Sequence, residues 1–285
     1  MAKLYYSRYH ISTGKDLTDK LDFILTGLRN DASVSHRGVL YKFFNSEIVE
    51  FNSVEYVTGE LVKYNPDDSE EVVDDDTMTI KNESIHNKVV ARARYIIDPT
   101  SSILMHFDVP NVISIANFRR KFTHLFEQNH DNFFTEFSLS PIKEQYSFIE
   151  KIKSFKSVKR ISITLYPSNP NYADRWKDID ERMRRVGIDK YKETQETKKP
   201  NASITVDDDT ENKFLMSEDG YGECDAFGIT ENGEERLIST KDNQKNINSN
   251  LPNGMNKALD ILLNISETLK EIIRRTSKWK LVTSY

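Results

Sequence analysis

The pattern of apolar and polar residues changes character about halfway along the chain. In the first half, apolar residues mostly alternate with polar ones, which is typical of half-buried strands. A strand is predicted at residues 3–11, and hairpin-like pairs of strands are predicted at 38–51, 54–64 and 89–109. Helices with apolar residues at three- and four-residue spacing are predicted at 16–30 and 112–130. This half is therefore expected to be strand-rich, with mixed or antiparallel pairing.

Two turns and one loop are predicted within this half. Asp98-Pro99 is expected to open the turn of the hairpin at 89–109, because both residue types favour turn geometry. Thr58-Gly59 is expected to turn the segment at 54–64. Residues 65–88 carry eight Asp and Glu with few apolar residues, so they are predicted to form an acidic loop.

Helices and strands alternate in the second half. The expected order is a helix at 143–155, a strand at 158–166, a helix at 173–186 and a strand at 191–199. A hairpin at 222–240 follows, with Asn232-Gly233 suited to a turn with positive φ. The last element is a long amphipathic helix at 255–275. We predict an α+β fold with two domains, 1–141 and 142–285.

The terminal helix carries an apolar stripe that includes Leu259, Leu262, Leu269 and Ile273. A helix that lies on its own domain would explain this stripe. Pairing with the same helix of a second copy, or with another protein, would explain it too. These four residues are therefore candidate partner-binding residues.

Composition narrows the class of protein. The lone Cys224 excludes an internal disulfide framework and a cysteine zinc site, and it fits a reducing cytosol. No stretch approaches the roughly 20 apolar residues that a membrane-spanning helix needs. The first residues also lack the apolar run of a secretion signal. We expect a soluble, cytoplasmic protein that does not bind membranes.

Charge is distributed unevenly along the chain. The net charge is −5, yet residues 143–199 hold 15 Lys and Arg against nine Asp and Glu. In the predicted helix at 173–186, acids and arginines four residues apart, such as Asp180 and Arg184, can pair with each other. The basic residues that have few acids beside them are Lys151, Lys153, Lys156, Lys159 and Arg160. These five are predicted to bind the phosphates of a nucleic-acid backbone.

No arrangement of residues typical of catalysis is found. The six histidines lack the spacing of a zinc site, and the acidic runs lack the pattern of a calcium loop. We predict no metal, no cofactor and no catalytic residue. Arg119 and His124 match the loose Arg–His spacing of the helical HEPN ribonucleases, although the surrounding strands do not fit that all-helical fold. A nuclease or toxin effector therefore stays open as an alternative.

Several stretches, taken in order, resemble a known family. They are RGVLYKFF with a following GELVKY, then YIIDPTSSILMHF, VKRISITLYPSNPN and DGYGECDAFG, between about residues 5 and 245. The order is similar to an uncharacterised bacterial family that is catalogued only as a domain of unknown function. In that family the third stretch ends in a proline–asparagine turn, matched here by Pro167, Asn169 and Pro170.

The resemblance also implies a biological setting, because genes of that family are often met beside phage-defence genes. More loosely, the layout resembles RexA, the DNA-binding sensor of the lambda exclusion system, and the DNA-binding subunit of Kiwa defence. We therefore expect a non-enzymatic component of bacterial antiphage defence that binds nucleic acid as a sensor or scaffold. The alternatives are a protein-interaction module that holds a defence effector, an oligomeric subunit, and the nuclease or toxin.

Overall fold

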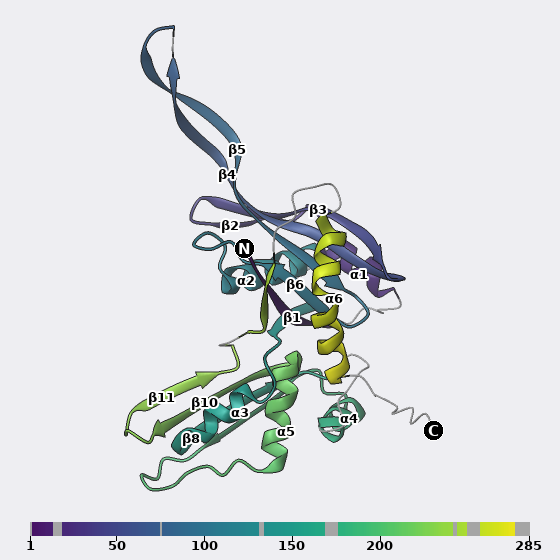
Figure 1. The fold of residues 1–285 in the computed structure, drawn as a ribbon, viewed down its shortest axis with the longest axis vertical. Helices are drawn as coiled ribbons and strands as arrows, with labels where there is room; N and C mark the ends of the chain where they lie inside the picture. Colours follow the sequence, from purple (N-terminus) through teal and green to yellow (C-terminus); the bar gives the residue numbers. More distant parts are fainter. Residues whose placement is uncertain are drawn as a thin grey trace.

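The computed structural model describes residues 2–13, 19–74, 76–130, 134–168, 176–241, 244–249 and 257–276. Two antiparallel sheets form its framework (Figure 1). The large sheet has eight strands in the order β12-β1-β6-β5-β4-β3-β2, with β7 also paired to β1. Its strands are β1 (Ala2–Thr13), β2 (Val34–His36), β3 (Val39–Phe51), β4 (Val54–Asp74), β5 (Thr79–Asp98), β6 (Ile103–Phe107), β7 (Thr135–Pro141) and β12 (Asn246–Ser249).

Helices cover both faces of the large sheet. Neighbouring residues of a strand point to opposite faces, so Ile97 packs in one core cluster and Ile96 in another. The first cluster includes residues of α1 (Lys20–Gly27) and α2 (Ile115–Asn129), and the second includes residues of α6 (Lys257–Thr276). Burial on both faces explains why the central strands are so apolar.

The small sheet has four strands in the order β11-β10-β8-β9, and the described helices that pack on it cover one of its faces. Its strands are β8 (Phe155–Leu165), β9 (Tyr191–Glu196), β10 (Gly222–Thr230) and β11 (Glu235–Ser239). The helices on it are α3 (Ser147–Lys153), α4 (Lys177–Val186) and α5 (Asp208–Met216), with a π-helical turn, η2 (Ser217–Tyr221), after α5. The predicted α+β class, the antiparallel first half and the long terminal helix are confirmed.

The chain returns to the large sheet at its end. β12 pairs with β1, and α6 packs on the strands of the large sheet rather than on the small sheet. The predicted boundary near Pro141 lies where the chain passes from β7 to α3. The last two elements of the predicted second domain therefore complete the core of the first.

The predicted acidic loop at 65–88 is wrong, because β4 and β5 continue through it as a two-stranded ribbon. Register pairs run without interruption from Asp67 with His86 to Asp74 with Thr79. Figure 1 shows this ribbon projecting from the body. High polarity argued for a loop, but a ribbon exposed on both faces needs no apolar alternation to keep its backbone hydrogen bonds.

The predicted turn at Thr58-Gly59 is also wrong. The chain turns at Asn52 and Ser53, which both have positive φ, and Gly59 lies inside β4. A Cβ atom at Gly59 would collide with the ring of Tyr95, so the glycine serves close packing instead of a turn. The predicted turns at Asp98 and at Asn232-Gly233 are confirmed, since Asp98 accepts bonds from the next turn residues and Gly233 has φ of 81°.

Candidate functional site

The five basic residues predicted to bind phosphate lie on α3 and β8, where they differ in their surroundings. Lys153 and Lys156 are exposed, and Lys151 is half-buried. Lys159 is held by its own chain, because its Nζ donates to the carbonyls of Lys199, Pro200 and Ala202 at 3.2, 2.8 and 2.6 Å. Arg160 lies on the open face of the small sheet, 5.8 Å from the ring of Phe227. Lys159 therefore has a structural role, and the five basic residues at 151–160 do not form a uniform binding surface.

The four apolar residues predicted to bind a partner lie on α6, which packs on the large sheet. Leu262 and Leu269 are buried in the core cluster that also holds Tyr6 and Ile103. Ile273 packs against the same cluster, and Leu259 lines a groove beside it. The stripe is thus largely accounted for by the chain's own core.

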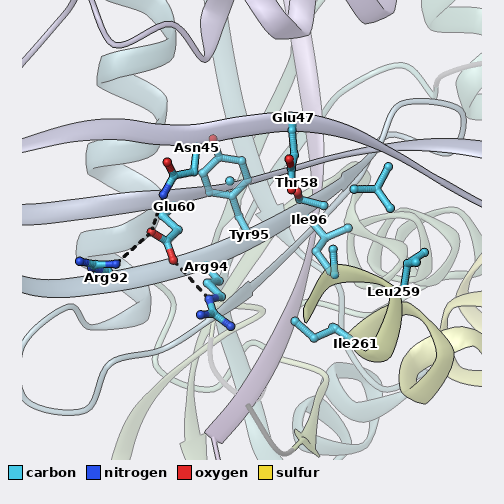
Figure 2. A pocket seen from close by; sticks show the side chains of 13 residues that line it. Asn45, Glu47, Thr58, Glu60, Arg92, Arg94, Tyr95, Ile96, Leu259 and Ile261 are labelled. Carbon is cyan, nitrogen blue, oxygen red and sulfur yellow. Dashed lines mark hydrogen bonds and ion pairs between the residues drawn. The ribbon is translucent and has the colours of Figure 1, made fainter. Parts of the chain in front are cut away.

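That groove holds about 480 Å³ between the start of α6 and strands β3, β4 and β5 (Figure 2). Glu60 lies at its polar end, where Arg94 Nε and Asn45 Nδ2 donate to its carboxylate at 3.3 and 3.1 Å. Arg92 lies 3.8 Å from the same carboxylate. Glu47 also lines the groove, so its acids balance its two arginines and it has no net charge to attract a polyanion.

The junction between the sheets is built from buried charged groups that are bonded by backbone carbonyls and by neighbouring side chains. Arg8 donates from Nε to the carbonyl of Asp219 at 3.0 Å and lies 4.3 Å above the ring of Tyr221. Trp176 donates its indole N–H to Asp219 at 3.1 Å, and burial raises the pKa of that carboxyl to about 6. The next acid back along the chain, Glu218, accepts from the N–H groups of residues 146 and 148 where α3 begins. The DGYGEC stretch therefore joins the two sheets.

A hollow of about 300 Å³ opens beside this junction. Burial lowers the pKa of Lys20 to about 8 and that of His10 to about 4. The Nζ of Lys20 is satisfied by Ser102 Oγ at 2.7 Å, and His10 donates to the carbonyl of Gly220 at 2.8 Å. Lys190, the other lysine of this hollow, is paired with Glu136 at 2.8 Å. These bonds position the strands around the junction and leave no excess charge for a ligand.

Positive charge gathers without acids at a different place, on α2 and the strands beside it. We define the α2 basic surface as His36, Arg37, Lys63, Arg120, Lys121 and His124. A hollow of about 370 Å³ is lined by four of them together with Ser33, Val34, Ser35 and Gln128, and by no acid of the described residues. This is the only hollow described above whose lining carries unbalanced charge.

The local structure explains how these cations are held together. Arg37 and Gly38 both have positive φ, which makes the tight turn between β2 and β3 and places the turn against α2. Lys121 is buried with its Nζ 5.0 Å from the centre of the Tyr41 ring, which offsets part of its desolvation. Arg120 donates to Asn117 Oδ1 at 2.9 Å, one turn earlier on α2.

The electrostatic effect of this crowding is seen at His36. Loss of hydration lowers the pKa of its imidazole, and the charges of Lys121, Arg37, Arg120 and Lys63 lower it further. The pKa of Lys121 is lowered as well, by burial and then by Arg120. Within the part of the chain that the structure describes, none of these four cations forms an ion pair. Their mutual repulsion would be relieved by a bound anion.

Another hollow of about 420 Å³ adjoins the hollow of the α2 basic surface along the same helix and shares Arg120 and His124 with it. Arg119 and His124, the pair that matched a ribonuclease spacing, both line it. Here acids stand among the cations, because Glu127 and Glu223 line the hollow too and Lys241 lies 2.9 Å from Glu223. Burial raises the pKa of Glu127, which accepts from the Phe137 N–H. Over the described ranges, no three metal-ligating side chains converge as metal ligands would. The nuclease stays a prediction.

Sequence reasoning missed the α2 basic surface because its members are spread from residue 36 to residue 124 and come from three separate elements. Two local signals were present, SHRG at 35–38 and RRK at 119–121. Neither is unusual in composition, and only the pairing of β2 with β3 and the packing of α2 bring them together.

Comparison with known proteins assigns the chain to a family but does not indicate an activity. A family model described as "Domain of unknown function (DUF4747)" matches residues 6–267. No curated protein matches the chain. Among the helices that the structure describes, none has the length and apolar character to cross a membrane.

Proposed function

Because the chain belongs to the DUF4747 family, whose description assigns no activity, we propose a function from the geometry: the protein binds nucleic acid through backbone phosphates at the α2 basic surface. The observation that carries the proposal is the gathering of Arg37, Lys63, Arg120 and Lys121 around His36 without an ion-paired acid among the described residues. In a bacterial antiphage system such a protein would act as a sensor or scaffold. That setting rests on the family resemblance.

The class of ligand follows from the distribution of charge. The chain as a whole carries a net charge of −5, so most of its surface repels a polyanion. A compact group of unpaired cations on such a protein fixes the side on which nucleic acid can approach. Contacts of lysine and arginine to phosphate release counterions and carry no sequence information. We therefore expect salt-sensitive binding with little sequence preference.

The test is a mobility-shift series on duplex DNA at several salt concentrations. Charge reversal by Arg120→Glu together with Lys63→Glu should weaken binding by on the order of tenfold or more at low salt, because two phosphate contacts become repulsive. The slope of log affinity against log salt should become shallower by about two. A matched control reverses the same number of charges at the small sheet, with Lys153→Glu and Lys156→Glu.

The control variant should bind nearly as well as the wild-type protein. If instead it loses affinity and the Arg120→Glu, Lys63→Glu variant does not, the binding surface lies on the row at 151–160. Wild-type binding that does not change with salt would exclude backbone phosphates as the main contact altogether.

A further inference from the structure

The ribbon formed by residues 65–88, which we call the acidic arm, pairs with no further strand among the described residues. β4 pairs with β3 only as far as Tyr64, and beyond that point its single partner is β5. None of the arm's described side chains is buried. Figure 1 shows the arm extending away from both sheets, so its outer part is not covered by its own chain.

A partner would stabilise an uncovered ribbon of this kind. A two-stranded hairpin is marginal in water, and both edges of the arm present unpaired backbone groups. Its outer part also exposes large apolar side chains, since Val73 and Ile80 are 70 % exposed and Met78 is 85 % exposed. Val73 and Ile80 are opposite each other in the register and lie on the same face. Such a cluster is typical of an interaction surface.

The charge of the arm restricts the kind of partner. It has eight Asp and Glu against two Lys, and both lysines pair with acids of the arm itself, Lys81 with Glu83 at 3.4 Å and Lys88 with Asp68 at 3.5 Å. Two arms placed side by side would bring like charges together and repel each other. The partner must therefore present positive charge.

We propose that the acidic arm docks on the α2 basic surface of a second copy of this chain. The two surfaces have opposite charge, and the arm of each copy points away from its own body (Figure 1). Lys63 precedes the arm by two residues, so each copy carries its arm beside its basic surface. That proximity allows two copies to exchange arms reciprocally, which closes the assembly at a symmetric dimer. This docking rests on the proposed function, because the arm would use the same α2 basic surface that is proposed to bind nucleic acid.

Nucleic acid and the arm would then compete for one surface. Phosphates displace the arm when nucleic acid is present, and the arm shields the cations from weak, unrelated anions when it is absent. Self-association is consequently salt-sensitive and is reversed by duplex DNA. The base of the arm would bind through its charges, and the tip of the arm would bind through its apolar side chains.

The test uses sedimentation velocity on the full chain at about 50 mM and about 500 mM salt, where the range of electrostatic forces differs several-fold. The wild-type protein should form dimers at low salt and monomers at high salt. A short-arm variant joins Asn65 to Lys88 through an Asn-Gly turn, which suits a two-residue hairpin. It should be monomeric at both salt concentrations, and so should the Arg120→Glu, Lys63→Glu variant. The Lys153→Glu, Lys156→Glu control should dimerise as the wild type does.

A charge exchange keeps the proposal testable if shortening the arm harms folding. An arm variant with Asp67→Lys, Asp68→Lys, Glu70→Lys and Glu71→Lys, which leaves four acids against six lysines, should lose self-association, and mixing it with the Arg120→Glu, Lys63→Glu variant should restore a complex. A wild-type monomer at low salt, or an unrestored mixture, overturns the proposal. DNA binding separates the two ideas, because the short-arm variant should bind duplex DNA at least as tightly as the wild type. If self-association fails while salt-sensitive DNA binding persists, only the docking of the arm is refuted.

Discussion

At the scale of single residues, glycines with positive φ serve two different purposes in this chain. Gly233 has φ of 81° at the tip of the β10–β11 hairpin, and a Cβ atom there would meet nothing within 4 Å. Gly220 has φ of 87° at the junction of the sheets, where a Cβ atom would lie 2.8 Å from Arg8 Cβ and 2.9 Å from Ile142 Cγ1. The two positions share a backbone conformation and differ in packing.

This pair separates the cost of backbone strain from the cost of crowding. Gly233→Ala should lower the free energy of unfolding by about 1 kcal/mol, because alanine disfavours positive φ. Gly220→Ala should lower it by about 2–4 kcal/mol, since crowding against Arg8 and Ile142 adds to the same strain. Chemical denaturation of both variants measures the difference. Equal losses would mean that the junction relaxes around the added methyl group.

The same scale shows where sequence reasoning about the site reached its limit. Lys159 and Arg120 look alike in the sequence, as cations with few acids beside them. The structure shows that Lys159 donates to three carbonyls of the segment after β9, whereas Arg120 lies near His36 and forms no ion pair with any described residue. Whether a cation is already bound by its own chain depends on contacts some 40 residues away. A count of charges among neighbouring residues in the sequence cannot detect these distant contacts.

At the scale of elements, α6 shows how an amphipathic helix can be read in two ways. Its stripe fitted either a second copy or the chain's own core. Leu262 is buried against the large sheet, whereas its neighbour Leu263 is 66 % exposed. These adjacent leucines make a matched pair.

Leu262→Ala should lower the free energy of unfolding by about 2–5 kcal/mol, because it removes a side chain from a closed core. Leu263→Ala should change it by less than about 0.5 kcal/mol, as expected for an exposed helix position. Thermal melting of the two variants, with sedimentation to follow their mass, measures both effects. A loss of dimer in the Leu263→Ala variant without a change in melting would show that α6 also serves as an interface.

Most elements were predictable because each has a local signal. Apolar residues at helical spacing predicted α2, and turn residues predicted the hairpins at Asp98 and Gly233. The acidic arm was not predictable, because a ribbon exposed on both faces lacks the apolar alternation that marks a strand. The pairing of β12 with β1 was not predictable either, because it joins residues almost 250 positions apart in the sequence.

At the scale of the whole molecule, the buried titratable groups link stability to pH. Burial lowers the pKa of His106 to about 3, and the charge of Arg119 lowers it further. Its ring stacks on Phe118 with centroids 4.0 Å apart, and neither ring nitrogen has a partner among the described residues. His10 has a pKa lowered to about 4 by burial, with an additional lowering from Arg8. Both imidazoles are therefore neutral in the folded protein at moderately acidic pH.

The sign of the effect follows from which state binds the proton first. As pH falls below the 6.5 of a free imidazole, the unfolded chain protonates His10 and His106 while the folded chain does not, so unfolding is favoured. Asp219 acts in the opposite direction, because its pKa is raised from 3.8 to about 6 and the folded state protonates first. Glu127 and Glu218, whose pKa values are also raised by burial, act in the same direction as Asp219. The stability that the two neutral histidines contribute should be lost between about pH 6 and pH 4.

His106→Leu should remove one of these protons and make the fall shallower by up to about 1.4 kcal/mol per pH unit, the value for one proton. The leucine also removes two buried nitrogens that lack partners, so stability at neutral pH need not suffer. Urea denaturation of both proteins from pH 4 to pH 7 measures the two slopes, with His86→Leu on the exposed arm as the control. The control should follow the wild-type curve. Identical slopes for His106→Leu and the wild type would show that His106 titrates normally and that water reaches its ring.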